Sequence, residues 1–315
     1  MKKTSLKHLL DIKYPIIMAP MFLVTNTKMM IEGMNSGIAA CIPALNYRTD
    51  ELLREAIQEI RSKTTSKGLG VNLIVNKSNI KMQQQLKTCV ELGVDFIITS
   101  LGSPKQVIEE CKGKRIKVFC DVVEEKYAVK VEQLGADAVI AVNSNAGGHA
   151  GKLTPEEIIP LLNKHCSIPV ISAGGIGTKD GVNKIMNLGA AGLSIGSPFI
   201  ACEEAHISEE YKKACVDYGK EDIVFTTKIS GTPCTIINTP YVQQTGTKQN
   251  WLEQLMSKNT KIKKWVKMIT YFKGMKTVEK AAFSSTYKTV WCAGPSIEYT
   301  KKILPIKKII SRLTT

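Results

Sequence analysis

The sequence has no long uninterrupted hydrophobic run. No stretch approaches the roughly 20 uncharged apolar residues that a membrane-spanning helix requires. No apolar segment follows Met1-Lys2-Lys3, as it would in a secretory signal. We therefore expect a protein without a transmembrane segment that stays in the cytoplasm.

Metal-binding and disulfide patterns are also missing. The nine cysteines form no Cys-x-x-Cys pair and their number is odd, which favours reduced thiols in a reducing compartment. Only four histidines occur, and His165 beside Cys166 or His206 one turn after Cys202 has no second ligand pair nearby. We expect no structural zinc site and no other bound metal.

The chain is rich in positive charge, and most of the excess lies near its C-terminus. The net charge is +15, and residues 241–315 contain 15 basic and three acidic side chains. Residues 258–272 mix lysines with apolar residues at helical spacing. This pattern fits a basic helix that touches an anionic membrane, an acidic carrier protein or nucleic acid, or a helix that packs its Trp265, Ile269 and Phe272 side on the protein. We favour the packed helix, and we expect no nucleic-acid partner because no recognised module accompanies the segment.

A repeated pattern predicts the fold class. Leu92-Gly93, Leu134-Gly135 and Leu188-Gly189 each end a helical pattern directly before an apolar run, and such alternation is typical of parallel βα units. Eight strands are predicted at 15–19, 38–43, 70–75, 96–99, 117–121, 138–142, 170–173 and 193–195, with helices at 27–35, 50–62, 79–92, 104–111, 124–134, 155–163 and 178–188. Eight strands favour an α/β protein with a (β/α)8 TIM barrel over the alternative, an open doubly wound sheet. The barrel core is expected at 1–204, and residues 205–315 are expected to be a mainly helical, basic extension that forms a lid or a homodimer surface.

The strand ends of such a barrel meet at one mouth, where the sequence places several candidate residues. The loop 145–151 follows a buried strand and sets His149 between glycines, which permit positive φ angles and close approach of a flat ligand. The alternative is a tight turn with an incidental histidine. Gly174-Gly175 and Gly196-Ser197 also follow strands, and the first pair precedes a helix, so both can cradle a phosphate with backbone N–H groups.

Three more strand ends carry candidates. Ala19, Pro20 and Met21 follow the first strand. Asn72 can offer a donor and an acceptor to the edge of a heterocycle, or it is a turn residue before Asn76. Asp121 is either a polar residue of the mouth or the N-cap of the next helix, and we favour the cap.

Four motifs carry a family resemblance: Pro15-Ile16-Ile17-Met18-Ala19-Pro20-Met21, Gly70-Val71-Asn72, Ala146-Gly147-Gly148-His149 and Ala173-Gly174-Gly175-Ile176. The chain resembles the nitronate monooxygenases, also called 2-nitropropane dioxygenases, and the related FMN-dependent enoyl-acyl-carrier-protein reductases. The resemblance covers residues 15–204, with weaker similarity at 230–233 and 291–294. It implies a flavoprotein with FMN as cofactor and His149 as the catalytic residue. The residues it implies for cofactor binding are Ala19, Pro20, Met21, Asn72, Asp121, Gly147, Gly148, Ala173, Gly174, Gly175, Gly196 and Ser197.

The resemblance also implies an activity. An enzyme of this type oxidises alkyl nitronates such as propionate-3-nitronate with molecular oxygen, and His149 would hold the nitronate oxygens or act as a base toward a neutral nitroalkane. The alternatives are an enoyl-acyl-carrier-protein reductase that uses NAD(P)H and an acidic carrier protein, and a flavin-binding protein without turnover. Relatives commonly have threonine and arginine at Ser197 and Pro198, and many have an acidic residue at Asn145, so phosphate contacts and substrate preference are expected to differ here.

Overall fold

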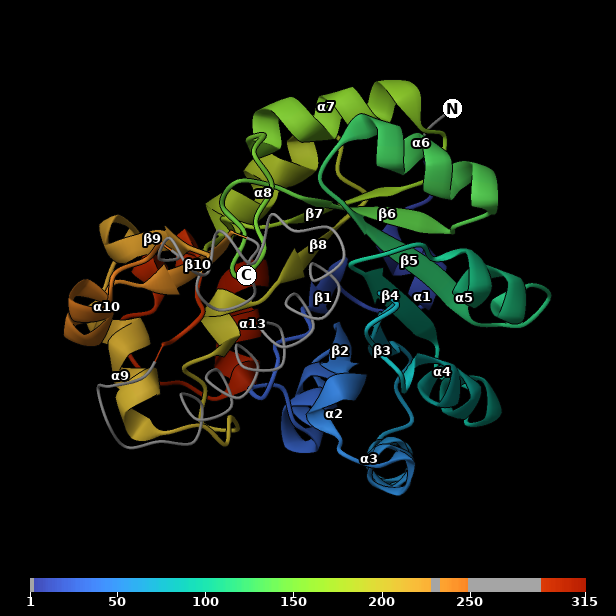
Figure 1. The fold of residues 1–315 in the computed structure, drawn as a ribbon, viewed down its shortest axis with the longest axis horizontal. Coiled ribbons are helices and arrows are strands. Elements are labelled where there is room, and N and C mark those ends of the chain that lie inside the picture. The colour runs from blue at the N-terminus through green and yellow to red at the C-terminus, as the bar shows by residue number, and fades with distance from the viewer. Residues whose placement is uncertain (1–2, 228–232, 249–289) are drawn as a thin grey trace, which may run out of the picture.

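The computed structural model describes residues 3–227, 233–248 and 290–315, and its centre is a closed barrel of parallel strands (Figure 1). The barrel strands are β1 (Ile16–Met18), β2 (Ala39–Pro43), β3 (Leu69–Ile74), β4 (Phe96–Ser100), β5 (Lys117–Val122), β6 (Ala138–Val142), β7 (Val170–Ala173) and β8 (Gly192–Ile195). Pairing of β1 with β8 closes the ring. The predicted TIM barrel is confirmed, and the open sheet is wrong.

Helices surround the barrel, one after each of the first seven strands (Figure 1). They are α2 (Thr27–Asn35), α3 (Asp50–Lys63), α4 (Met82–Glu91), α5 (Lys105–Cys111), α6 (Glu125–Leu134), α7 (Pro155–His165) and α8 (Lys179–Asn187). The largest error in a predicted boundary is at α4, which begins three residues later than expected. There the side chains of Asn76 and Asn79 accept hydrogen bonds from the backbone N–H groups of Ser78 and Lys81, and these local turns compete with the helix.

The amino-terminal end of the barrel is covered by α1 (Leu6–Leu10). The backbone N–H of Leu6 donates to the carbonyl of Ala191, directly before β8. A β-carbon on Gly192 would lie 2.5 Å from the Leu6 β-carbon, so glycine is needed for this close approach. Phe96 and Phe119 stack inside the barrel with ring centroids 5.3 Å apart. Because the amino-terminal half of the barrel interior is filled by side chains, a binding site is expected at the carboxyl ends of the strands.

The last helix of the barrel comes from the C-terminus. Helix α13 (Ile306–Thr314) packs against both α8 and α2, where the helix after β8 is expected in this fold. Its inward side chains Ile306, Ile309, Ile310 and Leu313 are buried, whereas the side chains of Lys307 and Lys308 are exposed. The described residues between β8 and α13 therefore form an insertion at the carboxyl end of the barrel.

The described part of this insertion is not only helical. It contains α9 (Glu209–Asp217), α10 (Pro240–Thr245), and an antiparallel pair of strands, β9 (Ile223–Thr226) and β10 (Cys234–Ile237). Short 3-10 helices lie at Ala44–Asn46, Ser197–Phe199, Lys220–Asp222 and Pro295–Tyr299. Strands β9 and β10 were not predicted, because four-residue strands show too little alternation to distinguish them from a loop.

Two predictions from the sequence concern residues that the structure does not describe. The basic segment 258–272 and the tryptophans Trp251 and Trp265 lie outside the described residues. Within residues 3–227, 233–248 and 290–315, no helix is long and apolar enough to cross a membrane. The same residues contain no group of three or more side chains that could hold a metal ion.

Candidate functional site

A cavity of about 780 Å³ lies at the carboxyl ends of the barrel strands. Each site residue predicted from the sequence lines it: Ala19, Pro20, Met21, Asn72, Asp121, Gly147, Gly148, His149, Ala173, Gly174, Gly175, Gly196 and Ser197. The fold therefore brings the whole predicted set together. That these residues bind a cofactor stays a prediction.

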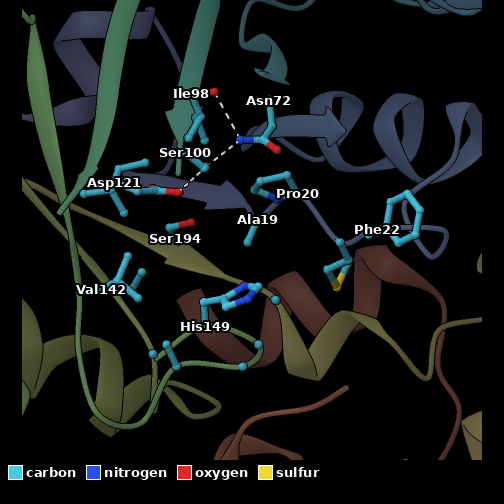
Figure 2. A pocket seen from close by; sticks show the side chains of 18 of the residues that line it. Ala19, Pro20, Phe22, Asn72, Ile98, Ser100, Asp121, Val142, His149 and Ser194 are labelled. Atoms are coloured by element: carbon cyan, nitrogen blue, oxygen red, sulfur yellow. Dashed lines mark hydrogen bonds between the residues drawn. The ribbon is translucent and has the colours of Figure 1, made fainter. Parts of the chain in front are cut away.

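One wall of the cavity carries a chain of hydrogen bonds that runs across three strands (Figure 2). The Asn72 amide Nδ2 donates to the Ile98 carbonyl at 3.1 Å and to the Ser100 Oγ at 2.8 Å. The Ser100 hydroxyl in turn donates to the Asp121 Oδ2 at 2.5 Å. Because Nδ2 is committed to these partners, Asn72 can present its Oδ1 to a ligand as an acceptor. The interpretation of Asn72 as a turn residue is wrong, since it lies within β3.

Asp121 belongs to this wall and not to a helix cap. Strand β5 continues to Val122, and α6 has Glu124 as its N-cap, so the favoured interpretation of Asp121 as an N-cap is wrong. Burial raises the pKa of Asp121 to about 6, and the hydrogen bond from Ser100 opposes this shift only in part. Near neutral pH the carboxyl group can therefore hold or release a proton.

Replacing Asp121 with asparagine should stabilise the protein above pH 6. The folded-state pKa lies above the ordinary value of 3.8, so stability falls as pH rises from about 4 to 6 and stays lower above that range. Asparagine does not titrate and can still accept from Ser100. We expect Asp121→Asn to have a free energy of unfolding about 3 kcal/mol higher at pH 8 and unchanged at pH 3.5, measured by urea titration. Parallel stability curves for the two proteins would contradict the raised pKa.

The opposite wall is formed by the loop after β6, which Asn143 fixes to β7. The buried Asn143 side chain donates from Nδ2 to the Gly174 carbonyl at 3.2 Å, and its Oδ1 accepts from the backbone N–H of Asn145 at 2.9 Å. Gly174 has a φ of +119°, and a β-carbon there would lie 2.4 Å from the Asn143 Oδ1. The two glycine-rich loops therefore fit together only with glycine at this position.

The His149 side chain extends from this loop into the cavity, across from Asn72 and Asp121 (Figure 2). Burial lowers the pKa of His149 below its usual 6.5. The imidazole is thus mostly neutral at pH 7, with one nitrogen as a donor and the other as an acceptor. A neutral ring can either donate a hydrogen bond to an anionic ligand or accept a proton from a neutral one.

Thr235 of β10 holds the backbone next to His149, and the sequence analysis did not find it. Its hydroxyl accepts from the Gly148 N–H at 2.9 Å and donates to the Ala146 carbonyl at 3.1 Å. Its backbone N–H donates to the Gly148 carbonyl at 2.8 Å, and the side chain is only 1% exposed. A residue 86 positions after His149 in the sequence thus fixes the loop, and no local pattern could reveal it.

Removing the Thr235 hydroxyl should lower the turnover rate as well as the stability of the fold. Thr235→Val keeps the shape but removes the side-chain bonds to Gly148 and Ala146, so His149 loses its fixed position. We expect kcat to fall about tenfold, with a loss of about 1 to 2 kcal/mol in the free energy of unfolding. Thr235→Ser should retain most activity. The control is Thr226→Val, which removes a buried hydroxyl of the same strand pair whose bond goes to the Thr247 carbonyl. Equal loss of kcat in both valine variants would contradict a role in positioning His149.

The insertion also contacts the loops after β6 and β8, where Gly294 meets Ser197 and Gly147. The Gly294 N–H donates to the Ser197 Oγ at 2.8 Å, and a β-carbon on Gly147 would lie 3.0 Å from both atoms. Ser197 is buried and begins the 3-10 helix Ser197–Phe199, in which Pro198 has no backbone N–H to offer. The weak similarity at 291–294 therefore lies at the cavity wall together with Gly147 and Ser197.

The cavity extends beyond the predicted residues toward α6. Leu101, Tyr127 and Lys130 also line it, and all three side chains are exposed to solvent. Leu101 adopts a φ of +60°, which is unusual for a branched side chain and costs of order 1 kcal/mol or more. This part of the wall could not be predicted, because none of these residues lies in a motif.

The barrel of parallel strands is closed, and a cavity lies at the carboxyl ends of its strands. Glycine loops follow β6, β7 and β8, and the imidazole of His149 faces the cavity. This arrangement is typical of a TIM-barrel enzyme. The sequence profile of the family described as "Nitronate monooxygenase" matches residues 3–315. The chain therefore belongs to the nitronate monooxygenase family and is an oxidoreductase.

Individual relatives agree with this assignment. A probable nitronate monooxygenase of Staphylococcus saprophyticus is 30% identical over 288 residues, which cover 76% of this chain and 80% of that protein. A carboxyl-CoA dehydrogenase of Rhodococcus jostii is 25% identical over 240 residues, covering 76% of this chain and 67% of that protein. The solved structure of FabK from Thermotoga maritima superposes with a TM-score of 0.85 at 28% identity, covering 99% of this chain and 95% of that one.

Proposed function

We propose that the protein is an FMN-dependent enzyme that oxidises alkyl nitronates with molecular oxygen. The observation that carries the proposal is the imidazole of His149, which faces the wall of Asn72 and Asp121 across a cavity large enough for a cofactor and a small substrate. Membership of the nitronate monooxygenase family supports the same reaction class.

The residues of the cavity fit an FMN molecule. The loops at Gly174-Gly175 and Gly196-Ser197 follow the adjacent strands β7 and β8, and all four residues line the cavity. We assign the phosphate group to these loops, where backbone N–H groups can donate to it. The Asn72 Oδ1 is suited to an N–H on the edge of a flavin ring. When bound, FMN would supply the oxidation-reduction chemistry of the reaction with the substrate.

The protein's own residues bind and orient the substrate. His149 donates a hydrogen bond from its neutral ring to a nitronate oxygen, and it thereby places the anion against the cofactor side of the cavity. Toward a neutral nitroalkane, the same ring accepts the proton from the carbon next to the nitro group. Asp121, at the opposite wall, holds or releases a proton through the Ser100 hydroxyl.

A second candidate is an enoyl-acyl-carrier-protein reductase that uses NAD(P)H. The structural likeness to FabK at 28% identity favours it, as does the extension of the cavity to the apolar residues Leu101 and Tyr127. An acyl chain would suit this part of the wall, and an acidic carrier protein would then be the partner. A protein that binds flavin without turnover remains the third proposal from the sequence.

An anaerobic titration distinguishes these functions. We expect the visible spectrum of the purified, FMN-loaded protein to change on addition of propionate-3-nitronate and to stay unchanged with NADH or NADPH. Bleaching by a nicotinamide nucleotide alone would support the reductase. Failure to retain FMN after incubation with an excess of it would contradict both enzymatic functions.

A further inference from the structure

Two cysteines lie together at the cavity wall and take no part in the proposed reaction. Cys234 begins β10, and Cys292 lies shortly before the 3-10 helix Pro295–Tyr299. Both line the cavity, and both are free thiols. Among the nine cysteines, all of which fall in described residues, Cys292 is the one that is partly exposed, whereas the other eight are buried.

The pairing of the backbone places the two thiols on the same face. Ile236 of β10 lies opposite Cys292 in an antiparallel bridge, and the Ile237 N–H donates to the Trp291 carbonyl at 2.9 Å. Side chains two residues apart in a strand share a face, so Cys234 is a diagonal neighbour of Cys292. The Cys234 thiol donates a hydrogen bond to the Cys292 sulfur.

The segment of Cys292 is held firmly on its other side. The Tyr211 ring stacks on Trp291 with centroids 5.5 Å apart, and the Tyr211 hydroxyl donates to the Cys292 carbonyl at 2.5 Å. The hydrogen bond from Cys234 lowers the pKa of Cys292 below its usual 9.0 and raises that of Cys234. Cys292 is therefore the attacking sulfur of the pair, because it is the one of the two that is partly exposed and because the thiolate is the reactive form.

We propose that Cys234 and Cys292 form a redox-active pair that closes to a reversible disulfide when hydrogen peroxide enters the cavity. The Cys292 sulfur attacks one peroxide oxygen and breaks the O–O bond, which gives a sulfenic acid and one water molecule. The Cys234 sulfur then attacks the sulfenic sulfur, forms the S–S bond and releases a second water molecule. The two thiols are oxidised by two electrons, and the peroxide is reduced by the same number.

The disulfide would connect the two segments that support the His149 loop. Cys234 directly precedes Thr235, which bonds to Gly148 and Ala146, and Cys292 lies two residues before Gly294, which packs on Gly147. Oxidation of the two cysteines would thus restrain the His149 loop through the two segments that hold it. This inference does not depend on which substrate the enzyme oxidises.

The first test compares thiol reactivity in the native, full-length protein at pH 7. Iodoacetamide should label Cys292 at least about tenfold faster than any of the other eight cysteines, as followed by mass spectrometry of digests. Cys234→Ser keeps a hydrogen-bond donor and should leave this rate nearly unchanged, whereas Cys234→Val removes the donor and should slow it. Equal rates for the wild type and Cys234→Val, or labelling of Cys292 no faster than that of the other cysteines, would overturn the proposal.

The second test uses hydrogen peroxide directly. In the wild type, we expect a Cys234–Cys292 cross-linked peptide that dithiothreitol removes. Cys234→Ser should instead accumulate a sulfenic acid at Cys292, trapped with dimedone, and Cys292→Ser should leave Cys234 reduced. Cys120→Ser, which removes a buried thiol of β5, should form the cross-link as the wild type does. Oxidation of Cys292 without the cross-link in the wild type would overturn the proposal.

Discussion

For the proposed nitronate oxidation, we expect the replacement of His149 with alanine to lower kcat/KM by about two to three orders of magnitude, while the variant should still fold and retain the proposed FMN cofactor. The loss is expected in catalysis because the imidazole faces the cavity, whereas its loop is held by backbone groups of Gly148 and Ala146 that alanine at 149 leaves intact. Oxygen consumption with propionate-3-nitronate measures the rate, and the flavin spectrum of the purified variant measures cofactor retention. His165→Ala, on the outer helix α7, is the matched control.

A second substitution separates the two roles of this imidazole. His149→Asn can donate a hydrogen bond but is not a useful base, so it should recover part of the rate with a nitronate and almost none with a neutral nitroalkane. With the nitroalkane, the wild-type rate should fall as pH decreases through the lowered pKa of His149, because protonation removes the base. Wild-type turnover in His149→Ala with either substrate would show that His149 is not catalytic.

We expect the replacement of Gly174 with alanine to cost about 4 kcal/mol in the free energy of unfolding and to prevent retention of the proposed FMN cofactor. Two costs add. The φ of +119° is strained for any L side chain, and the new β-carbon would lie 2.4 Å from the Asn143 Oδ1 and 2.5 Å from the Ala146 backbone nitrogen. Because the obstacle includes backbone of the His149 loop, the loop itself must move. Denaturant unfolding and FMN titration of the refolded variant measure the two effects.

Gly113 supplies the matched control for the backbone strain. It also has a positive φ, +75°, but a β-carbon there would meet no atom within 4 Å. Gly113→Ala should therefore cost only about 1 kcal/mol and leave FMN binding unchanged. If the two variants were equally destabilised, the contact between the loops after β6 and β7 would not be the reason for glycine at 174.

The sequence by itself determined the barrel and the place of its site. Leu134-Gly135 and its two counterparts end helices with glycine directly before apolar runs, and this local alternation leaves few arrangements other than parallel βα units. Because parallel strands have their carboxyl ends on one side, residues as distant as Ala19 and Ser197 could be assigned to one cavity from their positions alone. Local sequence patterns were sufficient wherever a feature depended on the residues of a single strand or helix.

Only the tertiary structure decided what surrounds and supports that cavity. Thr235 holds Gly148, Gly294 reaches Ser197, and Cys234 meets Cys292, in each case across more than 50 residues of sequence. A carboxylate shortly before a helix often caps it, and the sequence therefore favours a helix cap for Asp121. In the structure Asp121 instead accepts a hydrogen bond from Ser100, which lies on the neighbouring strand β4. The physical reason is common to these cases. A hydrogen bond or side-chain contact between distant segments depends on how closed sheets and insertions pack, and the residues that make it carry no periodic pattern of their own.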